Sequence, residues 1–263
     1  MLNKNIGSRA NVYIIMLLMF MLLVPSCRES SEDPDEGTGG EAGQVQSVSD
    51  SGAENLSKPT AGNVPLPIRL PNRRYEGTPQ DIRGVSNLEK PLGHDRPPFY
   101  APKGTENVAL GKPVTSSDEA PLIGDLEMLT DGDSEATDFS YVELGPLRQH
   151  VTIDLGGEYN IYAVLFWHYH KQPRVYFDVV VQVADDPDFI TNVRTLFNND
   201  IDNSSGLGVG GDMHYVDTHE GKLIGVEGGE SIRARYVRLY SKGSSADDAN
   251  HYIEVEVYGK AAK

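Results

Sequence analysis

The sequence predicts an all-β domain of antiparallel strands, and two observations lead to this prediction. Between residues 105 and 260, short runs rich in β-branched residues alternate apolar and polar positions with a period of two, the pattern of half-buried strands. Glycine, asparagine and aspartate separate these runs, and no apolar stripe of helical period is present after Val24. Several strands without helices between them favour an antiparallel sandwich or barrel.

The individual runs support this prediction in different ways. The alternating runs are residues 151–155, 179–183 and 253–257. Residues 163–167 are apolar at every position, as expected of a central strand covered on both faces. Residues 235–240 fit a partner strand with Val237 and Leu239 turned inward.

Composition limits the class of protein. The chain has 263 residues, of which 38% are hydrophobic, and this low apolar fraction favours one domain with a tail outside its core. Asp and Glu number 39 against 23 Lys and Arg, so the net charge of −16 would repel a nucleic-acid backbone. A single cysteine excludes an internal disulfide and a cysteine-rich zinc site.

The first 26 residues have the pattern of an export signal. Lys4 and Arg9 precede thirteen apolar residues, which are too few to span a membrane but match the apolar middle of a signal peptide. Residues 24–27, Val-Pro-Ser-Cys, resemble the lipobox of bacterial lipoproteins. That resemblance implies cleavage before Cys27, lipidation of Cys27, and an exported protein anchored in the bacterial cell envelope. An ordinary signal peptide with an incidental cysteine is the alternative.

Residues 27–104 are predicted to be a tether with two parts. Residues 28–57 contain eight acidic residues and one arginine, with too little apolar surface to offset the entropy of ordering, so we expect them to be disordered. Residues 59–102 hold nine of the sixteen prolines, which favour stiff extended structure. The apolar residues of this second part favour docking as an ordered strap on the domain, and a semi-rigid stalk is the alternative.

Five motifs in order along residues 105–260 resemble the signatures of the discoidin family, also called factor five/eight C-type or galactose-binding-like domains. They are residues 107–117, 129–133, 151–156, 234–239 and 253–259. The resemblance implies an eight-stranded jelly-roll β-sandwich with its ends close together and binding loops at one end. Residues 198–230 are longer and richer in glycine than the family pattern, so loop positions there cannot be carried over.

An Asp-Gly-Asp sequence is the candidate metal site. Asp131 and Asp133 flank a glycine that permits a tight turn, and hard cations such as calcium take six to eight oxygen ligands. The resemblance implies a structural calcium held here by these aspartates, a hydroxyl residue and a glutamate of the last strand, which places Thr137 and Glu254 in those roles. Taken without the family, the sequence would more simply be a turn.

The residues that close the central strand and begin the last one are the candidate ligand contacts. They are His168, His170, Arg174, Asn250, His251 and Tyr252, with Tyr141 as an outlying member. Two imidazoles two residues apart lie on one side of a strand and could bind a transition metal, but no third ligand is evident. The resemblance implies a sugar site built from such residue types, because planar polar groups and aromatic faces recognise saccharides.

No motif of catalysis is present. The sequence has no Gly-x-Ser-x-Gly, no phosphate loop and no His-Glu-x-x-His, and the glycines of residues 206–211 do not open a helix. The acidic pairs 185–186 and 247–248 could serve as glycosidase carboxylates only if the fold set them across a cleft. We therefore expect a non-catalytic, surface-anchored module that binds an extracellular or periplasmic glycan, with a module binding a surface protein as the alternative.

Overall fold

A computed structural model shows residues 59–74, 82, 84–226 and 230–263. The chain divides into two compact units, Met1–Ser47 and Val48–Lys263, and all described residues belong to the second. The predicted signal segment, Cys27 and the acidic part of the tether lie outside the described residues.

The described residues form an antiparallel all-β fold, as predicted, with one short 3₁₀ turn η1 at Leu126–Thr130. Eight strands are hydrogen-bonded into one sheet system: β3 (Glu106–Asn107), β4 (Val114–Ser116), β6 (Gln149–Trp167), β7 (Val180–Ala184), β8 (Arg194–Asn198), β9 (Lys222–Gly225), β10 (Ile232–Ser241) and β12 (Glu254–Ala261). Two further pairs are β1 (Asn63–Pro65) with β2 (Tyr100–Pro102) and β5 (Val142–Leu144) with β11 (Asn250–Tyr252).

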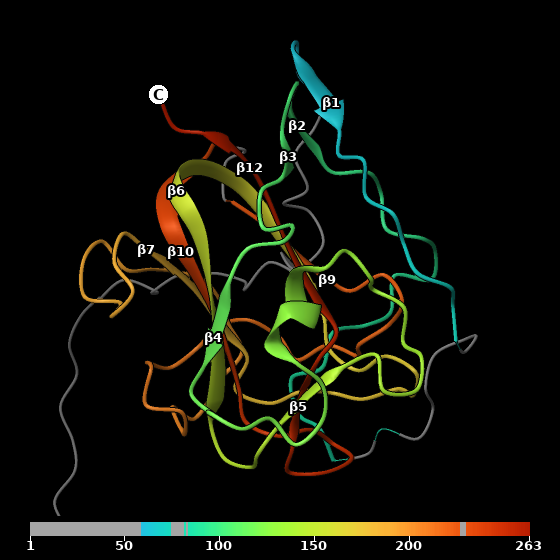
Figure 1. The fold of residues 1–263 in the computed structure, drawn as a ribbon. Helices are drawn as coiled ribbons and strands as arrows, with labels where there is room; N and C mark the ends of the chain where they lie inside the picture. The colour runs from blue at the N-terminus through green and yellow to red at the C-terminus, as the bar shows by residue number, and fades with distance from the viewer. Residues whose placement is uncertain (1–58, 75–81, 83, 227–229) are drawn as a thin grey trace, which may run out of the picture. The chain divides into compact units, whose positions relative to one another are not determined.

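The 19-residue strand β6 belongs to both layers of the sandwich. Its first part, residues 149–154, lies between β4 and β10, whereas residues 163–166 lie between β12 and β9. Between the two parts Gly156 adopts a φ of +78°, which glycine reaches without strain. Figure 1 shows that β6 arches over along its length. One strand thereby joins the first layer (β4, β6, β10, β7, β8) to the second (β3, β12, β6, β9).

The strand periodicity explains the core. Val151, Ile153 and Leu155 of the first layer and Val255 and Val257 of the second are fully buried in one apolar cluster between the layers. Residues 163–167, apolar throughout, face this cluster with alternate side chains, while Ala163, Leu165 and Trp167 belong to a second cluster. The prediction of a strand covered on both faces is therefore confirmed.

The proline-rich segment supplies the cover over the second layer. The strap, defined here as the described part of residues 59–104, contributes the buried residues Leu66, Phe99 and Ala101 to the second apolar cluster. Arg96 donates to the carbonyl of Gly221 at 3.0 Å, and a β-bridge joins Leu88 to His214. The docked arrangement is thus the one found for these residues, and packing of the folded unit begins before residue 105.

Candidate functional site

The candidate ligand residues lie where β6 ends and β5 pairs with β11. His168 and His170 follow Trp167 directly, and β11 carries Asn250, His251 and Tyr252 in register with Leu144, Glu143 and Val142 of β5. The fold therefore brings the predicted residues together at one end of the sandwich. Burial, however, separates them into an interior group and a surface group.

His168 is the centre of the interior group. Its imidazole stacks on Tyr176, with ring centroids 4.1 Å apart, and lies 3.0 Å from the Asp217 carboxylate through Nδ1. The Tyr215 hydroxyl is 3.4 Å from the same nitrogen. His168 and Asp217 have exposed fractions of 0% and 1%, so this pair is closed to a ligand arriving from solvent.

His170, Asn250 and Tyr252 are also fully buried and hold loops in place. The His170 Nε2 atom is 3.0 Å from the carbonyl of Ser134, next to the Asp-Gly-Asp turn. The Asn250 amide donates to two carbonyls of the β5–β6 loop, and its oxygen accepts from Ser241 and from the backbone of residue 243. These contacts use all four hydrogen-bonding positions of the amide.

His251 lies between the interior and the surface. Its Nε2 atom is 3.2 Å from the Glu143 carboxylate, and its Nδ1 atom is 3.9 Å from Asp247. The pKa of His251 is lowered to about 4, mainly by burial; the charge of Asp247 opposes this lowering and the charge of Arg174 adds to it. Burial also raises the pKa of Glu143, and the charge of Asp247 adds to this rise.

Four side chains form the solvent-facing part of the site, which we call the loop-end patch: Tyr141, Tyr169, Arg174 and Asp247. The two tyrosine rings meet edge to face at 4.9 Å. The Arg174 guanidinium lies 4.8 Å from the centre of the Tyr169 ring and binds Asp247 at 3.0 Å. Of the predicted ligand contacts, Arg174 is the member that reaches solvent most, and the outlying candidate Tyr141 lies beside it.

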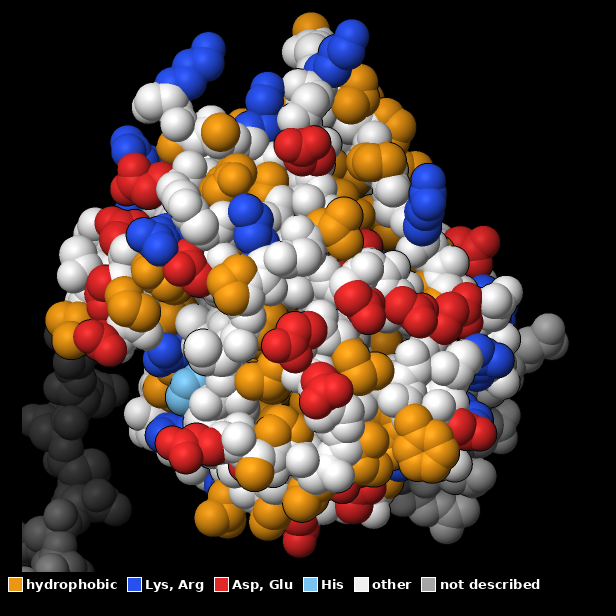
Figure 2. All heavy atoms as spheres, viewed as in Figure 1, with side chains coloured by type: hydrophobic (Ala, Val, Ile, Leu, Met, Phe, Trp, Pro, Cys, Tyr) orange, Lys and Arg blue, Asp and Glu red, His pale blue; other side chains and the backbone are white. Residues whose placement is uncertain are grey.

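The predicted calcium residues divide between surface and interior. Asp131, Asp133 and Thr137 are exposed, and the visible face around η1 carries many acidic side chains (Figure 2). Glu254 is fully buried, and its Oε1 atom accepts the backbone N–H of Gly132 at 3.2 Å. Its Oε2 atom has no hydrogen-bond partner, and burial together with the charge of Asp131 raises the pKa of Glu254 to about 9.

A second acidic group was not predicted as a site. Asp178, Asp200 and Asp202 each place an oxygen within 4.8 Å of the others, so they could hold a metal ion. Asp200 accepts the backbone N–H groups of Ser204 and Ser205, and the Lys242 ammonium is 3.6 Å from Asp178. The sequence showed an oxygen-rich run over residues 198–203, but nothing in it indicated that Asp178 of another loop lies beside that run.

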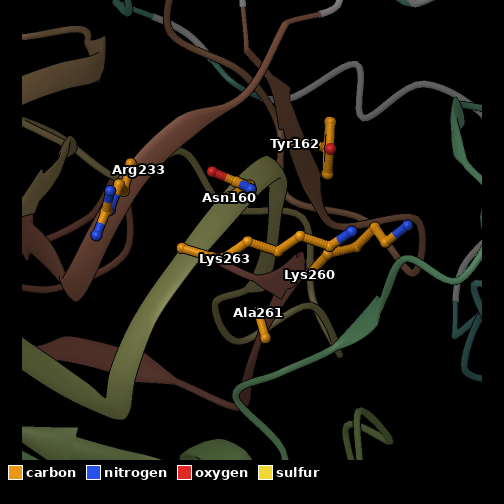
Figure 3. A pocket seen from close by; sticks show the side chains of 7 residues that line it. Asn160, Tyr162, Arg233, Lys260, Ala261 and Lys263 are labelled. Atoms are coloured by element: carbon orange, nitrogen blue, oxygen red, sulfur yellow. The ribbon is translucent and has the colours of Figure 1, made fainter.

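Two hollows lie away from the loop-end patch. One, of about 290 Å³, lies beside the C-terminus and is lined mainly by Asn160, Tyr162, Arg233, Lys260 and Lys263 (Figure 3). Asn160 precedes the end of β6 by seven residues, roughly 23 Å along an extended strand. The other, of about 320 Å³, lies between the strap and the second acidic group and is lined in part by Asp178, Asp202, His214 and Lys242. Neither hollow contains a predicted ligand residue.

The acidic pairs considered as glycosidase carboxylates are engaged in local contacts. Asp186 accepts the backbone N–H groups of Asp188, Ile190 and Thr191, and these bonds lower its pKa. Asp247 is paired with Arg174. Asp186 therefore fixes its own loop, whereas Asp247 joins its loop to the one that carries Arg174.

Comparisons with known proteins add similar solved structures. The CBM32 module of AlyQ, solved with 4,5-unsaturated mannuronic acid, is 17% identical, with 55% of this chain and 92% of that chain covered at a TM-score of 0.39. Chitosan-binding module 1 of a Paenibacillus sp. IK-5 chitosanase/glucanase is 20% identical, with 59% and 99% covered at 0.40. A Clostridium perfringens CBM32, solved with GalNAc-β-1,3-galactose, is 16% identical, with 59% and 99% covered at 0.41. No family model and no curated protein matches the chain.

Within the part of the chain that the structure describes, no helix is long and apolar enough to cross a membrane. Cys27, the predicted lipidation residue, lies outside this part.

Proposed function

We propose that this protein binds carbohydrate without transforming it, and that the loop-end patch makes the contact. The observation that carries the proposal is the stack of Arg174 on Tyr169, with Tyr141 at the edge of the ring and Asp247 beside the guanidinium. Such a surface offers hydrogen-bond donors, acceptors and an aromatic face within a few ångströms, which is the combination that polyhydroxylated rings need.

The charges of the loop-end patch favour a sugar without a negative charge. Arg174 is already paired with Asp247, and the nearby Lys171 is paired with Asp138. Glu143 adds an acidic group that faces His251. An anionic sugar would therefore meet carboxylates without a free cation, whereas hydroxyl groups can bind all of these side chains.

A glycan-array screen of the purified chain tests this function. A glycan bound by the wild type should bind at least about tenfold more weakly to Arg174→Gln, since a charge-assisted hydrogen bond contributes that much. The same loss is expected for Tyr169→Ala, which removes the aromatic face. Such losses with little change in melting temperature would support the loop-end patch. Lys171→Gln is the matched control, because it removes a neighbouring charge outside the patch. Absence of any glycan signal from a cooperatively folded protein would refute carbohydrate binding and favour the alternative, a module that binds a surface protein.

The location proposed for this activity is the outside of a bacterial membrane, with Cys27 as the lipidated residue. The sequence pattern that supports it is the thirteen-residue apolar run followed by Val-Pro-Ser-Cys. Metabolic labelling with an alkyne fatty acid tests it. Label in the wild type and none in Cys27→Ser is the expected result, and equal labelling of both would exclude Cys27 as the anchor.

We also propose that the Asp-Gly-Asp turn binds a structural calcium ion with Glu254. The residues fit such an ion because Glu254 buries a carboxylate oxygen that has no hydrogen-bond partner, directly below Gly132. A buried carboxylate without a counter-charge is costly, and a hard cation removes that cost. Asp131, Asp133 and the Thr137 hydroxyl would supply further oxygens, and the ion would tie the last strand to the turn.

Thermal unfolding in calcium and in chelator tests the calcium proposal. Calcium should raise the melting temperature of the wild type, and Glu254→Gln should remove most of this rise. Asp200→Asn is the comparison variant, because Asp178, Asp200 and Asp202 form the other group able to hold a cation. A calcium effect lost in Asp200→Asn and kept in Glu254→Gln would move the site to that second group and overturn the present assignment.

A further inference from the structure

The two outer faces of the sandwich differ in what covers them. The second layer is covered by the strap through Leu66, Phe99 and Ala101. On the first layer, Thr152, Arg238 and Gln182 lie side by side across β6, β10 and β7. Thr152 and Gln182 are buried, and the Arg238 guanidinium lies 3.9 Å from the centre of the Phe189 ring. Within the described residues, the strap does not extend over this face.

Two arginines on this face are not neutralised. Of the described residues, no carboxylate lies within 4.0 Å of the guanidinium of Arg148 or Arg238, whereas Arg233 and Arg235 of the same strand β10 are paired with Glu158 and Asp154. Arg238 donates to Thr152 at 2.7 Å and to the carbonyl of Pro187 at 2.8 Å. The chain has a net charge of −16, so two guanidiniums without a paired carboxylate give this face a local charge of the opposite sign.

The guanidiniums of Arg148 and Arg238 both lie near the Tyr240 ring. They lie 5.9 and 6.0 Å from the centre of the Tyr240 ring, and the His150 imidazole packs against that ring at 5.1 Å. Burial and then the charges of Arg238 and Arg148 lower the pKa of His150 to about 4. Both guanidiniums therefore act against protonation of His150, and on the neighbouring loop the Asp186 carboxylate accepts hydrogen bonds from its own loop backbone.

We propose that this face, centred on Arg148, Arg238 and His150, is a second binding site, which takes the carboxylate or sulfate groups of an acidic polysaccharide. Arginine binds such oxyanions through planar, paired N–H groups, and Arg238 keeps two of its five N–H groups without a protein acceptor. In the same register, Thr195 of β8 is exposed and adds a hydroxyl group to this face, whereas Thr152 and Gln182 are buried.

An acidic polysaccharide fits this face better than an acidic protein does. Protein interfaces have an apolar, well-packed centre, whereas the accessible groups at the centre of this face are the Arg148 and Arg238 guanidiniums and the His150 imidazole. Peptides that add to a sheet need an unpaired edge, but β10 and β7 are paired on both sides. The charge-based site is also separate from the loop-end patch, where the cations are already paired.

Binding of the full chain to four polymers tests the proposal: polygalacturonate for carboxylate, dextran sulfate for sulfate, dextran as the neutral match, and polyglutamate as an acidic peptide. We expect binding to polygalacturonate or dextran sulfate, or both, that weakens with salt, with none to dextran and little to polyglutamate. Arg148→Gln should weaken that binding about tenfold or more, because each charge-assisted contact contributes about 1.5–3 kcal/mol.

Control variants separate this site from the rest of the molecule. Arg233→Gln makes the same charge change on β10 at an exposed, ion-paired position and should leave binding unchanged. Arg174→Gln, which tests the loop-end patch, should also leave it unchanged. Equal losses in Arg148→Gln and Arg233→Gln, equal binding of polyglutamate, or no binding to either acidic polysaccharide would overturn the proposal. Arg238→Lys, measured beside its melting temperature, distinguishes loss of the site from loss of the fold.

Discussion

His168 and Tyr176 are stacked in the interior, with ring planes 14° apart and both side chains fully buried. Four of the residues that sequence reasoning selected as ligand contacts, His168, His170, Asn250 and Tyr252, therefore form a buried support under the loop end. Tyr252 lies 4.8 Å from the same imidazole, so β11 and the end of β6 are joined through aromatic rings. Their substitution should change stability first, and ligand binding only through it.

Asn250→Ala should destabilise the fold by about 3 kcal/mol, since it leaves buried groups of two loops without hydrogen bonds. The amide joins β10 to the β5–β6 loop through Ser241 and two carbonyls, including that of Gly145. Urea unfolding would measure this change. Asp248→Ala, two residues earlier and exposed, is the control and should remain within about 0.5 kcal/mol of the wild type. A near-neutral Asn250→Ala would show that this amide does not support the loops.

His251 should make the free energy of unfolding depend on pH. Its folded pKa of about 4 lies below the unfolded value of 6.5, so the unfolded chain binds the proton first as pH falls. The stability is fully present above pH 6.5 and is lost between pH 6.5 and 4, by at most about 1.4 kcal/mol per pH unit. Glu143, Asp247 and Arg174 face the imidazole.

His251→Gln checks this dependence. Denaturant unfolding at several pH values between 4 and 7 should show a shallower slope for the variant than for the wild type. His150, whose pKa is also lowered to about 4, stays in both proteins, so the difference in slope belongs to His251. Identical slopes would mean that the imidazole takes up its proton equally in the folded and unfolded chain.

The fold could be predicted from the sequence because sheet periodicity is local. The alternation of Val151, Ile153 and Leu155 with polar residues gives the buried face of a strand directly, and the all-apolar residues 163–167 indicated cover on two sides. What the periodicity could not show was that one strand serves both layers. That depends on the bend at Gly156 and on pairing with strands that are about 60 to 100 residues away in the chain.

The site was harder to predict because period two gives the side of a strand but not its depth. His168 and His170 were assigned to one side, yet the loops containing Asp217 and Ser134 close over them. Polar residue types indicated a surface, whereas here they satisfy buried backbone and one another. The Arg148 and Arg238 face was missed for a related reason: nothing local shows that their neighbours lack carboxylates.

Glu254→Gln should change stability in opposite directions with and without calcium. In chelator the variant should melt at a higher temperature than the wild type, because it replaces a buried carboxylate, held at a raised pKa, with a neutral amide of the same shape. In calcium the wild type should melt higher, because the variant loses a charged ligand of the ion. Calorimetry in the two buffers measures both signs, and the same sign in both would exclude a role for Glu254 in cation binding.

The contact between Phe99 and Gly225 should make two substitutions non-additive. A Cβ atom at Gly225 would lie 2.5 Å from the Phe99 ring, so Gly225→Ala must displace this ring from β9. Phe99→Ala should cost about 3–5 kcal/mol, because the ring is buried between the strap and the second layer. In the double variant the smaller side chain makes room for the new methyl group, so the total loss should fall short of the sum by about 0.5–3 kcal/mol. Strict additivity in urea unfolding would show that the strap does not press on β9 in solution.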